Sequence, residues 1–163
     1  MATKKTKQRT SRATEAKKTA PKRAAAAPTR TKGAASGTLS IRTASPGFTV
    51  NDLQKSLAWY RDVLGFAVKE RWESEGTLHG VELAAGPVTF MLGQDDWKKG
   101  RDRVKGAGFR IFCTTDENVD RLAERIKAHG GRLSQEPRDE WGMRALAVED
   151  PDGFKITIAS VKR

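Results

Sequence analysis

Residues 50–66 read VNDLQKSLAWYRDVLGF. Large apolar side chains recur in this stretch at the spacing of an α-helix. One face of that helix would collect Leu53, Leu57, Tyr60 and Leu64. Asn51 or Asp52 can cap its N-terminus, and Gly65 follows where a helix end favours a left-handed backbone. The stretch therefore predicts an amphipathic helix that buries one face.

The segments around this helix predict strands. Short apolar runs with the two-residue period of a strand lie on both sides of it. The predicted strands are residues 45–50, 66–72, 78–83, 88–92, 109–115, 132–135, 144–149 and 154–158. A second helix is expected to begin at a cap formed by Asp116 and to end at Gly130 and Gly131. Residues 93–108 between the two halves form a polar connection.

The order strand, helix, three strands thus occurs twice. At an offset of 65 residues, Leu57 matches Leu122 and Gly65 matches Gly130, which indicates an internal duplication. We predict an α+β fold in which two βαβββ modules form a half-open mixed β-barrel with a concave cavity for a small ligand. The folded domain is expected over residues 39–163, the size of a single domain.

A second stretch, residues 141–156, reads WGMRALAVEDPDGFKI. Residues 50–66 and this stretch resemble the opening and closing signatures of the vicinal oxygen chelate superfamily. That superfamily contains glyoxalase I, bleomycin-resistance and fosfomycin-resistance proteins, and extradiol dioxygenases. The resemblance covers about residues 42–160 and implies the superfamily's barrel fold, but it does not fix the activity because this fold carries many.

The resemblance also identifies the positions where a metal would be held. Enzymes of the family usually bind a divalent ion through His, Glu or Gln on the first, fourth, fifth and eighth strands. The matching positions here are Ser45, Met91, Arg110 and Thr157, with Phe109 in place of Arg110 if the strand register shifts by one. Serine and threonine are weak neutral donors, methionine suits Cu(I), and arginine is itself a cation. We therefore expect no metal at the usual place and no other cofactor.

The replaced positions and their neighbours predict a binding pocket instead. The side chains expected in its wall carry hydroxyl, thioether, aromatic and guanidinium groups: Ser45, Met91, Arg110, Phe112, Trp141, Arg144 and Thr157. A guanidinium suits a carboxylate or phosphate, and an aromatic ring suits a flat ligand. The predicted function is binding of an unidentified small molecule, as in the family's antibiotic-binding members, with no catalytic residue assigned. The alternative that these side chains fill a collapsed cavity stays open.

A metal enzyme is the second hypothesis. If the strand positions are shifted, donors could come from His79, Glu82 and Glu149. The resemblance would then imply a metal-dependent lyase, isomerase or dioxygenase. Against this, His79 and Glu82 are three residues apart on one predicted strand and should point to opposite faces.

Residues 1–38 differ from the rest of the chain in charge. They hold eleven Lys or Arg and one acidic residue, whereas residues 39–163 hold 20 Lys or Arg and 19 Asp or Glu. Apart from Met1 the segment has no large apolar side chain, so it is predicted to be disordered. Its composition resembles histone H1-type tails and allows non-specific nucleic-acid binding. The candidate contacts are Lys4, Lys5, Lys7, Arg9, Arg12, Lys17, Lys18, Lys22, Arg23, Arg30 and Lys32. A solubilising extension is the open alternative.

The remaining expectations concern compartment, assembly and the single thiol. No apolar run approaches the roughly 18 residues of a membrane span, and no secretory signal pattern is present. We expect a cytoplasmic protein that does not bind membranes. Cys113 is the only cysteine and is expected as a small buried side chain. The resemblance implies a homodimer, with the cavity built within one chain or shared by two.

Overall fold

The computed structural model describes residues 39–161, and the predictions for residues 1–38 lie outside this range. From Ile41 onward the chain forms one compact unit. The first module contains β1 (Gly47–Val50), α1 (Leu53–Ala58), the π-helical turn η1 (Trp59–Val63), β2 (Ala67–Ser74), β3 (Thr77–Ala85) and β4 (Val88–Gln94). The second contains β5 (Arg110–Thr114), α2 (Val119–Ala128), β6 (Leu133–Glu140), β7 (Met143–Glu149) and β8 (Lys155–Val161). Across residues 39–161 no helix is long and apolar enough to cross a membrane.

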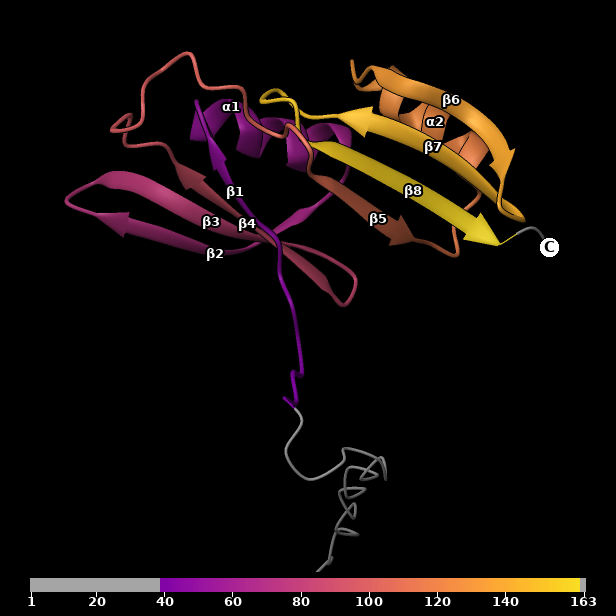
Figure 1. Cartoon of the computed structure of the whole chain (residues 1–163), viewed down its shortest axis with the longest axis horizontal. Helices are drawn as coiled ribbons and strands as arrows, with labels where there is room; N and C mark the ends of the chain where they lie inside the picture. The colour runs from indigo at the N-terminus through magenta and orange to yellow at the C-terminus, as the bar shows by residue number, and fades with distance from the viewer. Residues whose placement is uncertain (1–38, 162–163) are drawn as a thin grey trace, which may run out of the picture. The chain divides into compact units, whose positions relative to one another are not determined.

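Each module folds into one four-stranded mixed sheet (Figure 1). The strand order is β1-β4-β3-β2 in the first sheet and β5-β8-β7-β6 in the second. In both sheets the first strand of the module runs parallel to the last, and the other neighbouring strands are antiparallel. The predicted pair of βαβββ modules is therefore confirmed.

The first helix forms where residues 50–66 predicted it. Asp52 is the N-cap, and its Oδ1 accepts a hydrogen bond from the backbone N–H of Lys55 at 2.9 Å. After Ala58 the backbone widens into the π-helical turn η1. The predicted apolar face is buried, namely Leu53, Leu57, Tyr60 and Leu64.

The second helix begins later than the sequence suggested. Asn118, and not Asp116, is its N-cap, because Asn118 Oδ1 accepts the backbone N–H of Arg121 at 2.9 Å. Just before it, Thr115 Oγ1 accepts the backbone N–H of Glu117 at 3.1 Å. This local side-chain hydrogen bond holds a turn ahead of the helix, so the helix starts only after that turn.

Strand β6 is longer than predicted and extends through Pro137 to Glu140. Proline is tolerated here because β6 is an edge strand. An edge strand pairs on one side only, so it can accommodate a residue without a backbone N–H. The pairing with β7 is irregular between Gln135 and Arg138, on either side of this proline.

The two modules share one hydrophobic core. One face of each sheet packs against the apolar sides of α1, η1 and α2, and all these residues belong to a single buried cluster. Its sheet residues are Phe48, Val50, Val81, Leu83, Phe90 and Leu92 from the first module and Leu146, Val148 and Ile156 from the second. Side chains alternate along a strand, so the residues between them point away from this core. We call that side of each sheet its outer face.

A small set of polar contacts joins the modules at the edge of this core. Tyr60 Oη donates to Asp150 Oδ2 at 2.9 Å, while Asp150 Oδ1 accepts the backbone N–H groups of Asp152 and Phe154 at 3.0 and 2.8 Å. Ser56 Oγ donates to Asp152 Oδ2 at 3.1 Å. We call Ser56, Tyr60, Asp150 and Asp152 the module clasp. It ties the first helix to the turn between β7 and β8.

The clasp is buried, and this changes the chemistry of its groups. Tyr60 is fully buried and Asp150 is nearly so. Burial, followed by the nearby Asp150 carboxylate, raises the pKa of Tyr60, so its hydroxyl keeps the proton that it donates. Burial also raises the pKa of Asp150 above its ordinary value, although the hydrogen bonds that it accepts act in the opposite direction.

The connection between the modules was predicted at residues 93–108. It spans residues 95–109 and contains no helix or strand, because β4 continues to Gln94 and β5 begins only at Arg110. Asp95 anchors it. Its Oδ2 accepts from Lys105 Nζ at 2.5 Å and Arg103 Nη2 at 2.6 Å, and its Oδ1 accepts the backbone N–H of Trp97 at 2.9 Å. These hydrogen bonds, that of Lys105 first, hold the pKa of Asp95 well below its ordinary value.

Replacing Tyr60 with phenylalanine tests the clasp. Tyr60→Phe keeps the ring packing but leaves the buried Asp150 Oδ2 without its donor, so we expect a loss of about 1–3 kcal/mol in the free energy of unfolding. Urea denaturation of the full chain measures it. Asp62→Asn, in the exposed ion pair with Arg61, is the control and should change stability little. A Tyr60→Phe variant as stable as the wild type would show that the clasp does not hold the modules.

The Asp95 network predicts a pH dependence. A carboxyl with a depressed folded-state pKa adds stability above its unfolded pKa and loses that contribution as the pH falls through the folded value. Asp95→Asn should therefore be less stable near pH 7 and should lose less stability than the wild type between about pH 5 and pH 2. Urea midpoints across that range measure the difference. Asp102→Asn, in the same connection, should keep the wild-type profile, and an unchanged profile in Asp95→Asn would refute the role of this network.

Candidate functional site

Two of the predicted ligand residues lie on the outer face of the first sheet. Met91 is the register partner of Gly47 in the parallel pair of β4 and β1, and its neighbours along β4 are buried core residues. Ser45 precedes β1, and its hydroxyl shares a 2.5 Å hydrogen bond with Thr89 Oγ1, two residues before Met91. This face therefore offers a half-buried thioether beside two hydroxyl groups.

Three more predicted residues lie together on the outer face of the second sheet. Phe112 and Thr157 are register partners in β5 and β8, and Arg110 lies two residues before Phe112 on the same face. Phe112 is 50% exposed although β5 is paired with β8. This face therefore combines a cation, an exposed aromatic ring and a hydroxyl.

Sequence reasoning missed Lys155 at this place. Lys155 is the register partner of Arg110 in β8, and Glu149 of β7 lies opposite it on the other side. Within residues 39–161, neither Arg110 nor Lys155 takes part in an ion pair. Strand alternation could have identified it, because Lys155 lies two residues before Thr157 and must share its face.

The other two predicted residues lie elsewhere. Trp141 has a positive φ of 50° between β6 and β7 and is 80% exposed. Arg144 lies on the core side of β7, where its guanidinium contacts Asp120 at 2.6 Å and Asp139 at 3.4 Å. The hydrogen bond to Asp120 raises the pKa of Arg144. Arg144 therefore faces away from Thr157, and the seven predicted residues do not form one wall within this chain.

The four positions that match the family's metal ligands do not fit a divalent ion. The Ser45 hydroxyl is already engaged by Thr89, Met91 offers a soft thioether, and Arg110 brings a positive charge. Ser45 and Met91 lie on one sheet, whereas Arg110 and Thr157 lie on the other. This donor set lacks the carboxylate or imidazole groups that such ions need.

Two of the three alternative donors, His79 and Glu82, are engaged by other side chains. His79 Nε2 shares a 2.8 Å hydrogen bond with Ser74 Oγ. Glu82 Oε1 accepts from Lys69 Nζ at 2.9 Å, and this bond lowers the pKa of Glu82. In the described part of the chain, no three His, Cys, Asp or Glu side chains gather in a way that could hold a metal ion.

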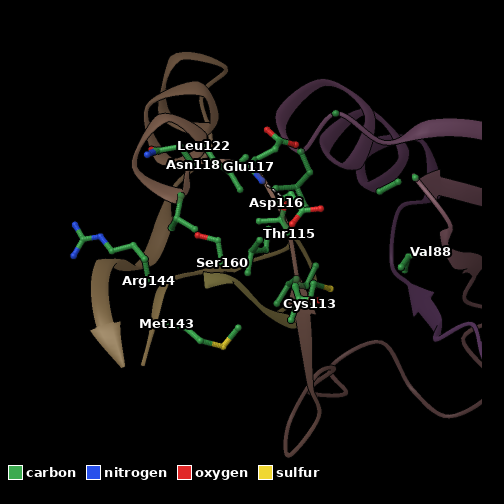
Figure 2. A pocket seen from close by; sticks show the side chains of 18 of the residues that line it. Val88, Cys113, Thr115, Asp116, Glu117, Asn118, Leu122, Met143, Arg144 and Ser160 are labelled. Atoms are coloured by element: carbon green, nitrogen blue, oxygen red, sulfur yellow. Dashed lines mark hydrogen bonds between the residues drawn. The ribbon is translucent and has the colours of Figure 1, made fainter. Parts of the chain in front are cut away.

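A separate large cleft, of about 1320 Å³, lies on the core side between the modules. It is bounded by the end of η1, the turn between β3 and β4, the end of β5, the start of α2, the start of β7 and the second half of β8. Figure 2 shows Val88 facing Cys113 and Thr115 across it. Of the seven predicted ligand residues, Arg144 alone lines this cleft. Burial raises the pKa of the Cys113 thiol, which disfavours the reactive thiolate.

Several curated proteins are similar in sequence to this chain. A probable lactoylglutathione lyase of Synechocystis is 32% identical over 120 residues, which cover 67% of this chain and 87% of that protein. The lactoylglutathione lyase of Salmonella typhimurium is 27% identical, over 69% of this chain and 87% of that protein. A probable chloroplastic lactoylglutathione lyase of Arabidopsis thaliana is 28% identical over 68% of this chain, which spans only 33% of the Arabidopsis protein.

Solved structures share the fold at low sequence identity. TnmS3, an antibiotic binding protein from Streptomyces, matches with a TM-score of 0.60 at 20% identity, over 77% of this chain and all of that one. TioX from Micromonospora matches with a TM-score of 0.60 at 20% identity, over 74% of this chain and all of that one. The sequence model of the Glyoxalase/Bleomycin resistance protein/Dioxygenase superfamily matches residues 42–158, and this chain belongs to that superfamily.

Proposed function

We propose that this chain binds a flat, anionic small molecule on its outer faces without a divalent metal at the superfamily's usual position. The observation that carries the proposal is the group on the second sheet, where Arg110, Lys155, Phe112 and Thr157 share one face. Two of the positions that would supply metal ligands in relatives are here a cation and a hydroxyl. A site of this composition favours an anion over a metal ion.

The cations are available for a ligand. Arg110 and Lys155 lie at paired positions, and neither is neutralised by an ion pair within the described residues. A guanidinium offers a planar fork of donors to a carboxylate, phosphate or sulfonate, and a lysine adds a point charge. Glu149, which lies opposite Lys155, sets a limit by repelling an anion that extends past β8. The anion should therefore lie nearest Arg110.

The Phe112 ring indicates the shape of the apolar part of the ligand. Phe112 is half exposed two residues along β5 from Arg110. A flat apolar body stacked on this ring would place a carboxylate within reach of the guanidinium. Thr157, the register partner of Phe112 in β8, adds one hydroxyl group that can donate or accept a hydrogen bond.

A second copy of the chain would complete the site. Ser45 and Met91 lie on the outer face of the first sheet, and the other group lies on the second sheet. The two sheets share no strand pairing. If the first sheet of one chain covers the second sheet of its partner, the two halves of the predicted set meet in one cavity. Trp72, the register partner of Gly80 on the outer face of the first sheet, is 38% exposed, and Phe112 is 50% exposed. Contact between two copies would remove this surface from water.

The similar proteins indicate two different functions, namely ligand binding and catalysis. TnmS3, which has the same fold, is an antibiotic binding protein, whereas the sequence relatives are lactoylglutathione lyases. The donor groups here favour the first comparison, because they lack the ligands for a metal. A metal-dependent lyase, isomerase or dioxygenase is the alternative function.

The proposal is tested by calorimetric titration of the full chain with 2-naphthoate and 2-naphthamide, which share a ring system but differ in charge. The carboxylate should bind more tightly, and Arg110→Gln should weaken its binding about ten-fold or more while leaving the amide unchanged. Arg121→Gln on α2 is the control, since it removes one positive charge from the opposite side of the sheet. Equal binding of the two probes, or equal effects of the two variants, would contradict the proposal.

A further inference from the structure

The connection between the modules differs in charge from the rest of the folded domain. Residues 39–161 hold 18 Lys or Arg and 19 Asp or Glu. The connection, residues 95–109, holds five of these basic side chains and three of the acidic ones. The remaining residues of this range therefore hold 13 basic and 16 acidic side chains. A single loop thus carries positive charge on a domain that is otherwise negative.

Most of this positive charge faces solvent. Figure 1 shows the connection as a long loop that projects beyond the sheets between β4 and β5. Its cations Lys98, Lys99, Arg101 and Arg103 are exposed, whereas the side chain of Lys105 is buried. Four cations are therefore presented together on one loop at the surface.

The inner part of the connection has more cations than carboxylates. Asp95 Oδ2 contacts both Lys105 Nζ and Arg103 Nη2. The side chain of Lys105 is 4% exposed and that of Arg103 is 37% exposed. The buried lysine already matches the single charge of Asp95, so Arg103 adds an unmatched positive charge that a partner can reach.

The outer part of the connection also has unmatched cations. Lys99 and Arg101 take part in no ion pair within residues 39–161. Asp96 is matched by Lys98, whose Nζ lies 3.0 Å from its Oδ2. Asp102 is the one acidic side chain of the connection that has no ion pair in this part of the chain. After this carboxylate is counted, a surplus of two positive charges remains on the loop.

The connection is also held in one shape around Trp97. This tryptophan has a φ of 61°, which is uncommon for a large side chain. The Arg101 guanidinium lies 4.5 Å from its ring centroid and Lys105 Nζ lies 5.5 Å from it. The backbone N–H of Gly100 donates to the Trp97 carbonyl at 3.0 Å. Because Arg101 is already positioned, less conformational entropy is lost when it meets an anion.

We propose that the connection is a surface for the sugar–phosphate backbone of nucleic acid, contacted by Lys99, Arg101 and Arg103. Exposed cations without ion pairs bind phosphates through release of counterions. The Trp97 ring is occupied by Arg101 and Lys105, so the surface offers no free ring on this residue for base stacking, and we expect no base sequence to be read.

A polymer of phosphates fits the whole chain better than an acidic patch on another protein. Residues 1–38 hold eleven Lys or Arg and one acidic residue, a composition that allows non-specific nucleic-acid binding. A nucleic acid is long enough to meet two separate basic segments at once, which strengthens binding beyond that of either segment. The proposal concerns the folded domain and does not depend on the anion group of the outer face.

The salt dependence of DNA binding tests the proposal. Fluorescence anisotropy of a labelled duplex of about 20 base pairs is measured with the full chain between about 50 and 200 mM salt. In a plot of log affinity against log salt, each phosphate contact adds about 0.9 to the slope. Replacing both Lys99 and Arg101 with glutamine should lower the slope by about 2 and weaken low-salt binding about three- to ten-fold.

A matched pair of substitutions controls for net charge. Arg121 and Arg132 are exposed and form no ion pair within residues 39–161. Replacing both with glutamine removes the same charge from outside the connection and should keep the wild-type slope. Lys99→Gln alone leaves the Trp97 contacts intact and should lower the slope by about 1.

Nuclear magnetic resonance locates the contact. The chain has four tryptophans, and each gives its own indole N–H signal. The signal of Trp97 should move when the duplex is added, because Arg101 lies on its ring. The signal of Trp59, which packs against the core, should stay fixed. Binding of 2-naphthoate should be the same in the Lys99 and Arg101 variant as in the wild type.

Four results overturn the inference. The first is no binding of the duplex by the full chain. The second is an unchanged slope when Lys99 and Arg101 are replaced, which would assign the contacts to other residues. The third is an equal loss in the control pair, which would leave only net charge. The fourth is polyglutamate bound as tightly as DNA at equal salt and weakened equally by the variant, which would identify an acidic protein as the partner.

Discussion

The hydrogen bond from Tyr60 to Asp150 is the constraint on which the rest of the structure depends. It joins the first helix to the turn between β7 and β8, and it is buried at the edge of the shared core. Because the helix-side faces of both sheets are used in that core, the remaining faces of both sheets point outward. The positions that would meet around a metal in a closed barrel therefore lie on two separate surfaces of one chain. Within one chain, a ligand site at these positions therefore lies on one sheet or on the other.

The two sides of the second sheet differ in the charged groups that they present. The outer face of the second sheet presents Arg110 and Lys155 without ion-pair partners among the described residues, whereas the cleft behind it is lined by more carboxylates than guanidinium groups. The two surfaces lie on opposite sides of β5, since alternate residues of a strand point to opposite faces. Phe112 serves one surface and Cys113, the next residue, serves the other.

Local patterns predicted the fold because its signals are local. Helical spacing placed Leu53, Leu57 and Tyr60 in the core, and the repeated element order predicted both modules. The predicted cap at Asp116 was wrong because Thr115 and Asn118 compete for the nearby backbone N–H groups, and a sequence does not show which hydrogen bond forms. The end of β6 was missed because Pro137 normally argues against a strand and is tolerated only at an edge.

The site was predicted less completely than the fold. Strand alternation correctly grouped Arg110 with Phe112, and the same rule would have added Lys155. The position of Arg144 depends on ion pairs with α2, which follow from tertiary packing. The cleft depends on how one module sits against the other, so no local pattern could have indicated it.

We propose that this chain holds no divalent metal at the superfamily's usual position, and one measurement tests this most directly. The full chain, purified without chelators, is dialysed against Zn²⁺, Ni²⁺, Co²⁺ and Mn²⁺ in turn, and the retained metal per chain is determined by mass spectrometry. The donor groups at Ser45, Met91, Arg110 and Thr157 predict no stoichiometric retention of any of the four ions. One tightly held equivalent per chain, lost when Ser45 and Thr157 are both replaced by alanine, would contradict the account.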